Sequence, residues 1–420
     1  VSARTVNTIE NPLQQWTNSI HAKSGSVVSI SAGFGGYNTV AEYACNSCHV
    51  PHNAGGAAGL LRTPTVVAPN IDQTSQSCVG CHNGSNTLLE PILNVVDVMA
   101  VKGHPYANDA NKHSPAEDVV PNQNRHATCA DCHNAHAAQQ TVAFNDAPGL
   151  RPSQNGVLGV AADGSKLTGP AANQYENCLR CHGNSTGKQA LTNVYGYLPV
   201  RAAFGGDQLN LINQFGPSAI STHPVMRDAA KINQPSLLSN MWDLSGVTKT
   251  RVIGSRILCT DCHNSDNNRE FGGNGPNGPH GSNNDHILER QYLISQVTPG
   301  TYPTGGPGSP ITNLVQNLQP GDSRLQPNGN GPFAMCAKCH DLNSIMSDQS
   351  FTRHSLHLTS GISCSACHSA HGVPVGSANV SGERLVNFDV NVVAPYNGVL
   401  SYSGGSCTLT CHTKDHNNIK

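Results

Sequence analysis

The chain has 420 residues and a formal net charge of −2, and only 12% of its residues are charged. Hydrophobic residues make up 37% and aromatic residues 5%, while 42 glycines and 26 prolines interrupt regular elements. This composition argues against a conventional core of long amphipathic elements, against a highly charged disordered chain and against a nucleic-acid partner. Something other than side-chain packing is therefore expected to hold the chain together.

Few regular elements are predicted. In chain order, helices are expected over residues 8–22, 286–297 and 347–358, and short strands over 385–393. Pro12 suits the first turn of the first helix because its missing N–H has no helical partner there. Long turn-rich segments separate these elements.

The cysteines are strongly patterned. All sixteen fall into eight pairs, and a histidine directly follows each pair. Seven pairs have the spacing C-x-x-C-H, and the eighth, CTLTCH, has one extra residue between its cysteines. The pairs are Cys45/Cys48, Cys78/Cys81, Cys129/Cys132, Cys178/Cys181, Cys259/Cys262, Cys336/Cys339, Cys364/Cys367 and Cys407/Cys411. The histidines that follow them are His49, His82, His133, His182, His263, His340, His368 and His412.

C-x-x-C-H is the attachment sequence of c-type haem. The two thiols form thioethers to the porphyrin edge, and the next imidazole becomes the proximal ligand of the iron. The spacer must be short because the two thioether positions are fixed on the macrocycle, and the extra residue of CTLTCH is expected to be absorbed as a bulge. We therefore predict eight covalent haem c groups, held by the sixteen cysteines and the eight histidines that follow them.

Other uses of paired cysteines fit less well. A zinc site needs two such pairs for each metal ion and has no use for a histidine after every pair. Disulfide scaffolds belong to much shorter chains and do not repeat one local motif. A thioredoxin-like redox pair occurs once, on a βαβ unit that is not visible here.

The sixth ligand of each iron is also expected to be histidine. Eight of the 21 histidines are proximal, and the five methionines lie at no consistent offset from the motifs. Three motifs extend to C-x-x-C-H-x-x-H and end at His52, His136 and His371. Because three residues are too few to wrap around one haem, we expect the second histidine to ligate a neighbouring haem and to hold two haems in contact.

The remaining distal ligands are predicted from local context. His104 and His223 each precede a proline, which fixes the local backbone. The predicted distal set is His52, His104, His126, His136, His223, His280, His357 and His371. His21 and His416 are reserves, ranked above His113 and His286, and ordinary surface histidines are the alternative for these four. His354 and His357 lie three residues apart on a predicted helix, so both are placed to face haems.

The predicted fold is mostly coil with a few short helices and minimal β structure. The motifs extend from residue 45 to residue 412 at irregular gaps, so neither a true repeat nor a domain boundary is expected. We predict a single cytochrome c domain, residues 1–420, wrapped around a chain of stacked haems. Without haem the chain should be unfolded, as small metal-organised domains are.

The expected location follows from the haem chemistry. Haem c is attached outside the bacterial cytoplasm, in the compartment where disulfides also form. The chain begins without a charged and then apolar leader, so a signal peptide is expected to have been removed. No apolar run approaches the ~18 residues of a membrane span. We expect the protein to be extracellular or on the outer cell surface, with the periplasm as the alternative.

The chain resembles bacterial multihaem c-type cytochromes and is similar to the outer-surface cytochromes of metal-reducing bacteria. The resemblance covers nearly the whole chain and rests on CNSCHVPHNA at 45–54, RHATCADCHNAH at 125–136, GPNGPHGS at 275–282 and CTLTCHTKDH at 407–416. Some similar cytochromes polymerise into extracellular filaments, in which a histidine just after an early motif crosses to the next subunit. The resemblance implies that role for His52. It also implies a second copy of the chain, other redox proteins or mineral acceptors as partners.

Two classes of function remain open. The first is an electron conduit, in which eight closed bis-histidine haems carry current and no residue is catalytic. The second is an octahaem enzyme acting on small nitrogen or sulfur species, which needs an open iron, often marked by lysine in place of the proximal histidine. No C-x-x-C-K occurs in this sequence. A soluble periplasmic shuttle, a porin-associated complex and a storage or sensing role are further alternatives, and low charge density favours a filament over a shuttle.

Overall fold

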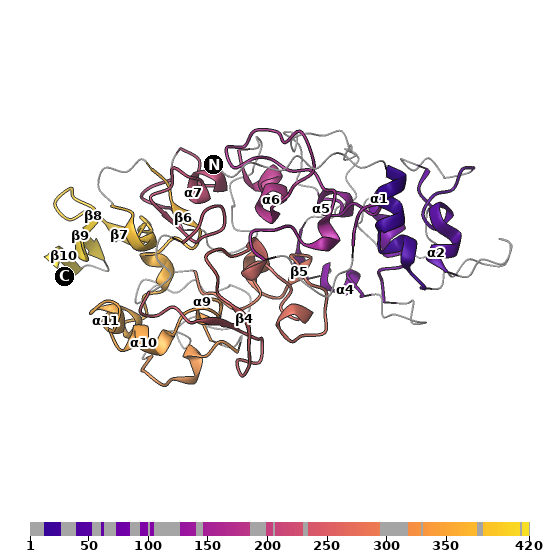
Figure 1. Ribbon diagram of the computed structural model, residues 1–420. Helices are drawn as coiled ribbons and strands as arrows, with labels where there is room; N and C mark the ends of the chain where they lie inside the picture. Colours follow the sequence, from indigo (N-terminus) through magenta and orange to yellow (C-terminus); the bar gives the residue numbers. More distant parts are fainter. Residues whose placement is uncertain are drawn as a thin grey trace. The chain divides into compact units, whose positions relative to one another are not determined.

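The computed structural model describes residues 12–26, 39–52, 60–62, 73–84, 93–99, 101–104, 127–139, 146–184, 199–204, 206–229, 234–294, 318–328, 331–375, 381–411 and 414–419. Most of these residues are coil and turn, joined by short helices and small antiparallel sheets (Figure 1). The predicted fold class is therefore confirmed. No helix in the described ranges is long and apolar enough to cross a bilayer.

The chain divides into two compact units. The first unit comprises Val1–Lys188 and Asn274–Ser282, and the second comprises Gln189–Gly273 and Asn283–Lys420. Each unit contains four of the eight cysteine pairs. The single domain expected from the sequence stays a prediction.

The first unit is built from short helices. They are α1 (Pro12–Asn18), α2 (Val40–Tyr43), α3 (Gln73–Val79), α4 (Val96–Met99), α5 (Cys129–Cys132) and α6 (Gln174–His182), with 3-10 turns η1 (His21–Lys23), η2 (Ala44–Ser47) and η4 (Pro152–Gln154). Strand β1 (Lys102–Gly103) pairs antiparallel with β5 (Gly281–Ser282). This pairing attaches the distant segment 274–282 to the first unit.

The second unit has more strands. Its helices are α7 (Leu211–Phe215), α9 (Ala334–Ala337), α10 (Leu342–Met346) and α11 (His354–Thr359), with 3-10 turns η5 (Cys259–Asp261), η6 (Arg269–Phe271), η7 (Asp285–Ile287), η8 (Ser323–Leu325), η9 (Cys364–Ala366) and η10 (Glu383–Leu385). Two small antiparallel sheets pair β2 (Ser221–Thr222) with β6 (Gly372–Val373), and β3 (Asn240–Trp242) with β4 (Lys249–Val252). The C-terminal sheet has the order β10-β9-β7 with β8 also on β9, from β7 (Val393–Ala394), β8 (Ser401–Ser403), β9 (Ser406–Cys411) and β10 (Lys414–Ile419).

Two predicted helices form and two other predicted elements do not. Helix α1 begins at Pro12, and α11 occupies the end of the predicted segment 347–358. The helix predicted over 286–297 is wrong over its described part, because His286 and Ile287 have positive φ angles and the following chain is extended. The strands predicted over 385–393 are likewise wrong: only Val393 belongs to a strand, and Leu385 has a positive φ.

Apolar packing in the described residues is divided among small clusters. One contains Leu318, Leu325, Phe333, Ala337, Leu342, Met346 and Leu358, and another contains Val386, Phe388, Val393, Tyr402, Leu409 and Cys411. Both lie in the second unit. The first unit has a cluster of Leu150, Val157 and Ala171. Clusters of this size are small for a 420-residue chain, which agrees with a core completed by a non-protein group.

Candidate functional site

The seven C-x-x-C-H motifs share one local structure. Each begins on a helical turn, formed by η2, α3, α5, α6, η5, α9 and η9. In six of them the histidine N–H donates to the carbonyl oxygen of the first cysteine at 2.8–2.9 Å; these histidines are His49, His82, His133, His263, His340 and His368. In the remaining one, the fourth motif of the chain, His182 is the last residue of α6. The turn therefore gathers two thiols and one imidazole, as attachment to a porphyrin edge requires.

Two of these turns are capped by an aspartate inside the motif. The Thr128 N–H donates to the Asp131 carboxylate at 2.8 Å, and the Leu258 N–H donates to the Asp261 carboxylate at 2.8 Å. A carboxylate in this position satisfies a backbone donor that the first turn of a helix leaves without a partner. The sequence C-x-D-C-H thus stabilises its own turn.

All sixteen cysteines are free of disulfide bonds. The disulfide-scaffold alternative is therefore wrong for this structure. Burial raises the pKa of the Cys181, Cys262 and Cys367 thiols to about 12, so these thiols are protonated at neutral pH.

Cysteines of different motifs lie close together. Apart from burial, the pKa of a thiol in one motif is raised by a thiol of another: Cys48 by Cys81, Cys132 by Cys178, Cys262 by Cys339, and Cys367 by Cys411. A hydrogen bond to Cys364 is the largest cause of the raised pKa of Cys336. The cysteines of motifs one and two lie near each other, as do those of motifs three and four, and in the second unit the cysteines of successive motifs lie near each other from motif five to motif eight.

Histidines face one another in pairs of nearly constant separation. Seven pairs have ring centres 5.9–6.3 Å apart: His21–His82, His49–His136, His104–His182, His133–His280, His263–His371, His354–His368 and His357–His416. Six of these pairs contain one histidine of a C-x-x-C-H motif. His223 lies beside the remaining motif histidine, His340, whose pKa is lowered to about 4, first by burial and then by His223 and His368.

The separation of the rings fits a haem iron between them. Bonds from transition metals to imidazole nitrogen are about 2.0 Å, and that nitrogen lies about 1.1 Å from the ring centre. Two imidazoles on opposite sides of one iron therefore have centres about 6.2 Å apart. The side chains present thus fit bis-histidine haem.

Backbone carbonyls fix the orientation of many of these rings. Nδ1 donates to a carbonyl oxygen at 2.5–3.1 Å in His21, His104, His133, His223, His263, His357 and His368. Because a carbonyl can only accept, the proton is on Nδ1 and the Nε2 lone pair is left for a metal. Histidines that ligate metals usually donate their other ring N–H in this way.

Burial keeps several of these imidazoles neutral. It is the largest cause of the lowered pKa of His82, to about 4, of His280, to about 3, and of His368, to about 4. The pKa values of His104, His133 and His223 are lowered by burial as well. The neutral form is the one that ligates iron.

The structure places five of the eight predicted distal histidines in ring pairs. These are His104, His136, His280, His357 and His371. His223 has no such ring contact among the described residues, but it contributes to the lowered pKa of His340. His52 is exposed and makes no ring contact with another described residue. His126, together with the proximal prediction His412 and the low-ranked His113, lies outside the described residues.

Three histidines outside the predicted distal set also occur in pairs. His21 and His416, held as reserves, face His82 and His357, and His354 faces His368. The i,i+3 spacing of His354 and His357 on α11 was the sequence signal for both. No comparable signal linked His21 to His82, because His21 lies far from any motif. Ligation of iron by each of these residues stays a prediction.

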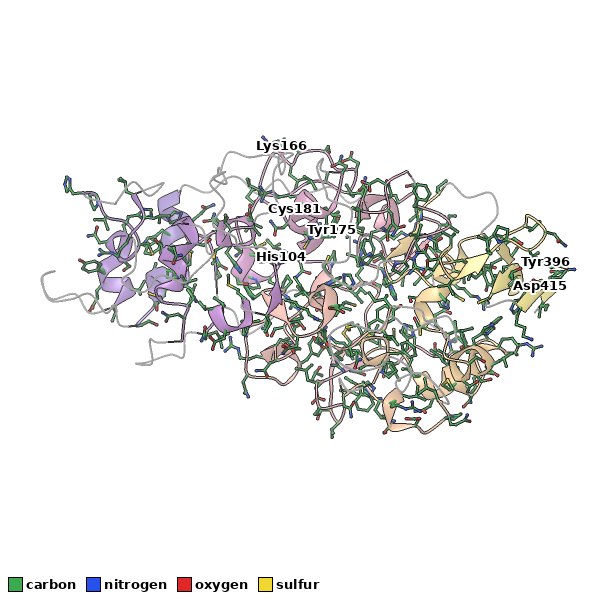
Figure 2. All side chains as sticks on the ribbon, turned by 180° about the vertical axis from the view of Figure 1, so that it is seen from behind. His104, Lys166, Tyr175, Cys181, Tyr396 and Asp415 are labelled. Carbon is green, nitrogen blue, oxygen red and sulfur yellow. The ribbon has the colours of Figure 1, made fainter. Side chains whose placement is uncertain are left out.

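The arrangement links the haem positions within each unit. His136 follows His133 in the third motif but faces His49 of the first, and His371 follows His368 in the seventh motif but faces His263 of the fifth. One short segment therefore contributes to two histidine pairs, and ligation of two haems by it stays a prediction. In Figure 2, Cys181 marks the fourth motif and His104 the partner of its histidine, and Asp415 marks the C-terminal hairpin.

Comparison with known proteins gives one family match. The model described as "Doubled CXXCH motif" matches residues 38–87, which span the first two motifs. No curated protein and no solved structure matches the chain. The family match indicates a multihaem c-type cytochrome with covalently bound haem and a role in electron transfer.

Proposed function

We propose that this chain carries eight bis-histidine c-type haems and transfers electrons along them. The observation that carries the proposal is the set of histidine pairs with ring centres 5.9–6.3 Å apart, most with one member in a C-x-x-C-H motif. Haem c, when bound, supplies a reversible one-electron couple of its iron.

The residues of the chain determine how that couple is used. The thiols hold the porphyrin edge, and an imidazole on each side closes both axial positions of the iron. Substrates are then excluded from the metal, and ligation by two histidines keeps the potential below that of a His/Met site. The Nδ1 bonds to carbonyls hold seven of these imidazoles in one orientation, which would limit rearrangement on electron transfer.

Adjacent attachment edges provide the path. In the first unit Cys48 lies near Cys81, and Cys132 lies near Cys178. In the second unit the thiols of Cys336 and Cys364 are joined by a hydrogen bond, and Cys367 lies near Cys411. Porphyrins held by these cysteines would lie near one another, which would let electrons pass directly between them.

The alternative function is an octahaem reductase or oxidoreductase of small nitrogen or sulfur species. It requires an iron with an open sixth position. The purified protein separates the two functions: its intact mass counts the covalent haems, and electron paramagnetic resonance counts low-spin and high-spin iron. We expect eight haems, all low-spin. A stoichiometric high-spin signal together with turnover of nitrite, hydroxylamine or sulfite would replace electron transfer with catalysis.

We further propose that the protein works outside the cell or on its outer surface, as the subunit of a polymeric cytochrome filament. Support comes from the resemblance to filament-forming cytochromes and from His52, which is exposed just after the first motif and makes no ring contact with the other described residues. In the filament His52 would ligate a haem of the neighbouring subunit. Since histidines of the same chain already face the motif histidines of the described sites, this donation would replace one of those partners.

Electron microscopy of the extracellular fraction tests the filament. We expect regular filaments from the wild type and dispersed particles from His52→Ala, with the covalent haem count unchanged. Val247→Ala, which changes an exposed side chain outside every motif, serves as the control and should leave filaments intact. Filaments formed normally by His52→Ala would remove His52 from the assembly, and particles from the wild type in place of filaments would favour a soluble shuttle in the periplasm.

A further inference from the structure

We propose that a buried ion cluster where the fifth and sixth motifs meet sets the reduction potentials of the two haems attached there. The cluster consists of Lys338, Glu289 and Arg290; the charge of Lys338 raises both potentials and the charge of Glu289 lowers them. This inference rests on the proposed function, because it takes the fifth and sixth motifs to carry haem. It goes beyond that function by assigning a role in electron transfer to side chains that are not ligands.

Lys338 belongs to one motif and binds the other. It lies between Cys336 and Cys339 of the sixth motif and directly precedes Cys339. Its Nζ donates to the backbone carbonyl oxygen of Asp261 at 2.7 Å, and Asp261 directly precedes Cys262 of the fifth motif. The ammonium group is therefore held where the two motifs are in contact.

Glu289 binds two cations out of contact with water. The side chains of Glu289, Lys338 and Arg290 are all fully buried. The Glu289 carboxylate accepts from Lys338 Nζ at 2.9 Å and from Arg290 Nε at 2.9 Å. It also accepts from Asn268 Nδ2 at 3.1 Å. One carboxylate thus fixes the positions of both cations.

Three more charged side chains surround this cluster. Arg251 forms ion pairs with the carboxylates of Asp261 and Glu270, the second at 2.7 Å. Together with Lys338, Arg290 and Glu289, these groups make three cations and three anions. The charges are balanced, so replacing any one of them with a neutral side chain leaves a net charge beside the two motifs.

Phe271 covers the ammonium group. Its side chain is fully buried, with Lys338 Nζ 3.4 Å from the ring centre and Arg251 Cζ 5.4 Å from it. The face of an aromatic ring attracts cations. A charge enclosed in this way is screened far less than one at the surface, so it acts strongly on its neighbours.

The thiols of both motifs show the effect of this charge. Burial raises the pKa of Cys262 to about 12 and that of Cys339 to about 11, and Lys338 opposes both shifts. Burial lowers the pKa of Lys338 itself, and the Glu289 carboxylate acts in the opposite direction. A cation that favours negative charge at both attachment positions also favours an added electron on the haems held there.

Buried charge provides a difference between haems that the ligands do not. The predicted axial ligands are histidine at every site, and identical ligands cannot by themselves give different potentials. Reduction adds one negative charge, so a buried cation nearby raises the potential and a buried anion lowers it. The fifth and sixth haems are thus tuned together by one ammonium group.

The test begins with the wild-type holoprotein. Mass spectrometry must show haem on the peptides that contain Cys259 with Cys262 and Cys336 with Cys339. If these peptides carry no haem, the inference and the proposed function of these two motifs are both overturned. If they carry haem and the variants below leave the potentials unchanged, the inference alone is overturned.

Two variants of opposite charge decide the inference. In redox titrations of haem-loaded protein followed by electron paramagnetic resonance, Lys338→Gln should shift two midpoint potentials downward. Glu289→Gln should shift the same two upward, and the other six should not move. The low-spin signals lost in His371→Ala and His223→Ala identify these two as the fifth and sixth haems.

The opposite signs separate charge from packing. In Lys338→Gln the Glu289 carboxylate keeps its bonds to Arg290 and Asn268, so only the charge of Lys338 is lost. Loosened packing would admit water in both variants and would shift the potentials in one direction. Shifts of the same sign, or no shift in either variant, would overturn the inference. If Lys338→Gln does not load haem, the direction of the shift in Glu289→Gln decides.

Two lysine variants serve as controls. Lys338→Arg keeps the positive charge and should leave both potentials close to those of the wild type. Lys249→Gln removes an exposed cation of β4 that lies 4.9 Å from the Trp242 ring centre, and water should screen its effect. A shift in Lys249→Gln as large as that in Lys338→Gln would overturn the role of the buried cluster.

Discussion

The two units use the same ligand scheme on different local structures. In both, the third motif of the unit supplies the partner of the first: His136 faces His49, and His371 faces His263. In both, the partner of the second motif's histidine precedes all four motifs of its unit, as His21 and His223 do. The fourth motif differs, because Cys178 and Cys181 lie on helix α6 whereas Cys407 and Cys411 lie on strand β9.

This comparison shows which features a haem site requires. Two imidazoles at a fixed separation recur throughout, while the element that carries the cysteines and the distance along the chain to the partner both vary. The element that carries the cysteines can therefore change from helix to hairpin while the separation of the histidine rings stays the same. Regular gaps between motifs are not needed, and this explains why the spacing of the motifs showed no repeat.

A second parallel concerns the contact between neighbouring motifs. Arg180, in the fourth motif, donates to the Asp131 backbone carbonyl at 3.3 Å. Lys338, in the sixth, donates to the Asp261 backbone carbonyl at 2.7 Å. Both aspartates cap their own turns, so each unit joins two motifs through a basic residue that precedes a second cysteine.

Removal of haem should cause the largest loss of structure, and the loss should differ between the two units. We expect the chain produced without haem attachment to lose most of its structure, because the described apolar clusters are small. The second unit, with clusters of seven and six buried residues, should retain more protection than the first, with a cluster of three. Circular dichroism and hydrogen exchange measure both effects. A fully folded apoprotein would show that packing alone suffices.

Loss of the shared ligands should affect the units equally. His136→Ala and His371→Ala each remove the partner of one motif histidine, so each variant should convert one haem of eight to the high-spin state. The haem count by mass should not change, since the thioethers remain. Electron paramagnetic resonance gives the spin count, and conversion of two haems by either variant would break the equivalence of the units.

Replacing the basic residue that joins two motifs should lower stability more in the second unit than in the first. Lys338 is fully buried, with Nζ 2.9 Å from the Glu289 carboxylate, so Lys338→Met should lower stability by about 3 kcal/mol. Arg180 lies 3.6 Å from the Asp131 carboxylate, and Arg180→Met should cost about 1 kcal/mol. Urea midpoints of fully haem-loaded variants provide the measurement. Equal shifts would mean that the carbonyl contact, common to both, dominates.

The angles between imidazole planes should produce the smallest, spectroscopic difference. In the first unit they range from 4° for His133–His280 to 87° for His21–His82, whereas the second unit lies at 27–40°. Parallel axial rings split the iron d orbitals more than perpendicular rings do. We expect His21→Ala to remove the most axial low-spin signal and His280→Ala one of the most rhombic. If the most axial signal remained in His21→Ala and all rhombic signals remained in His280→Ala, the pairing of these histidines with His82 and His133 would be contradicted.

Some features of this protein follow from the sequence because they depend on neighbouring residues. The thiols and the following histidine of a C-x-x-C-H motif lie on one helical turn, so their spacing predicts their geometry. The low content of regular structure follows in the same way from glycine and proline. The local rule fails at CTLTCH, where pairing with β10 and β8 imposes an extended strand on the motif.

The partner of each histidine was decided only by the tertiary structure. His280 reaches His133 because β5 pairs with β1, and neither strand has a sequence signal of its own. Non-helical chain at 288–294, in place of the predicted helix, accompanies burial of Glu289 and Arg290 in an ion cluster with Lys338. Covalent attachment is a local property of a few consecutive residues, so the sequence by itself determined it. The pairing of histidines is a contact between distant segments, and it depends on how the whole unit folds.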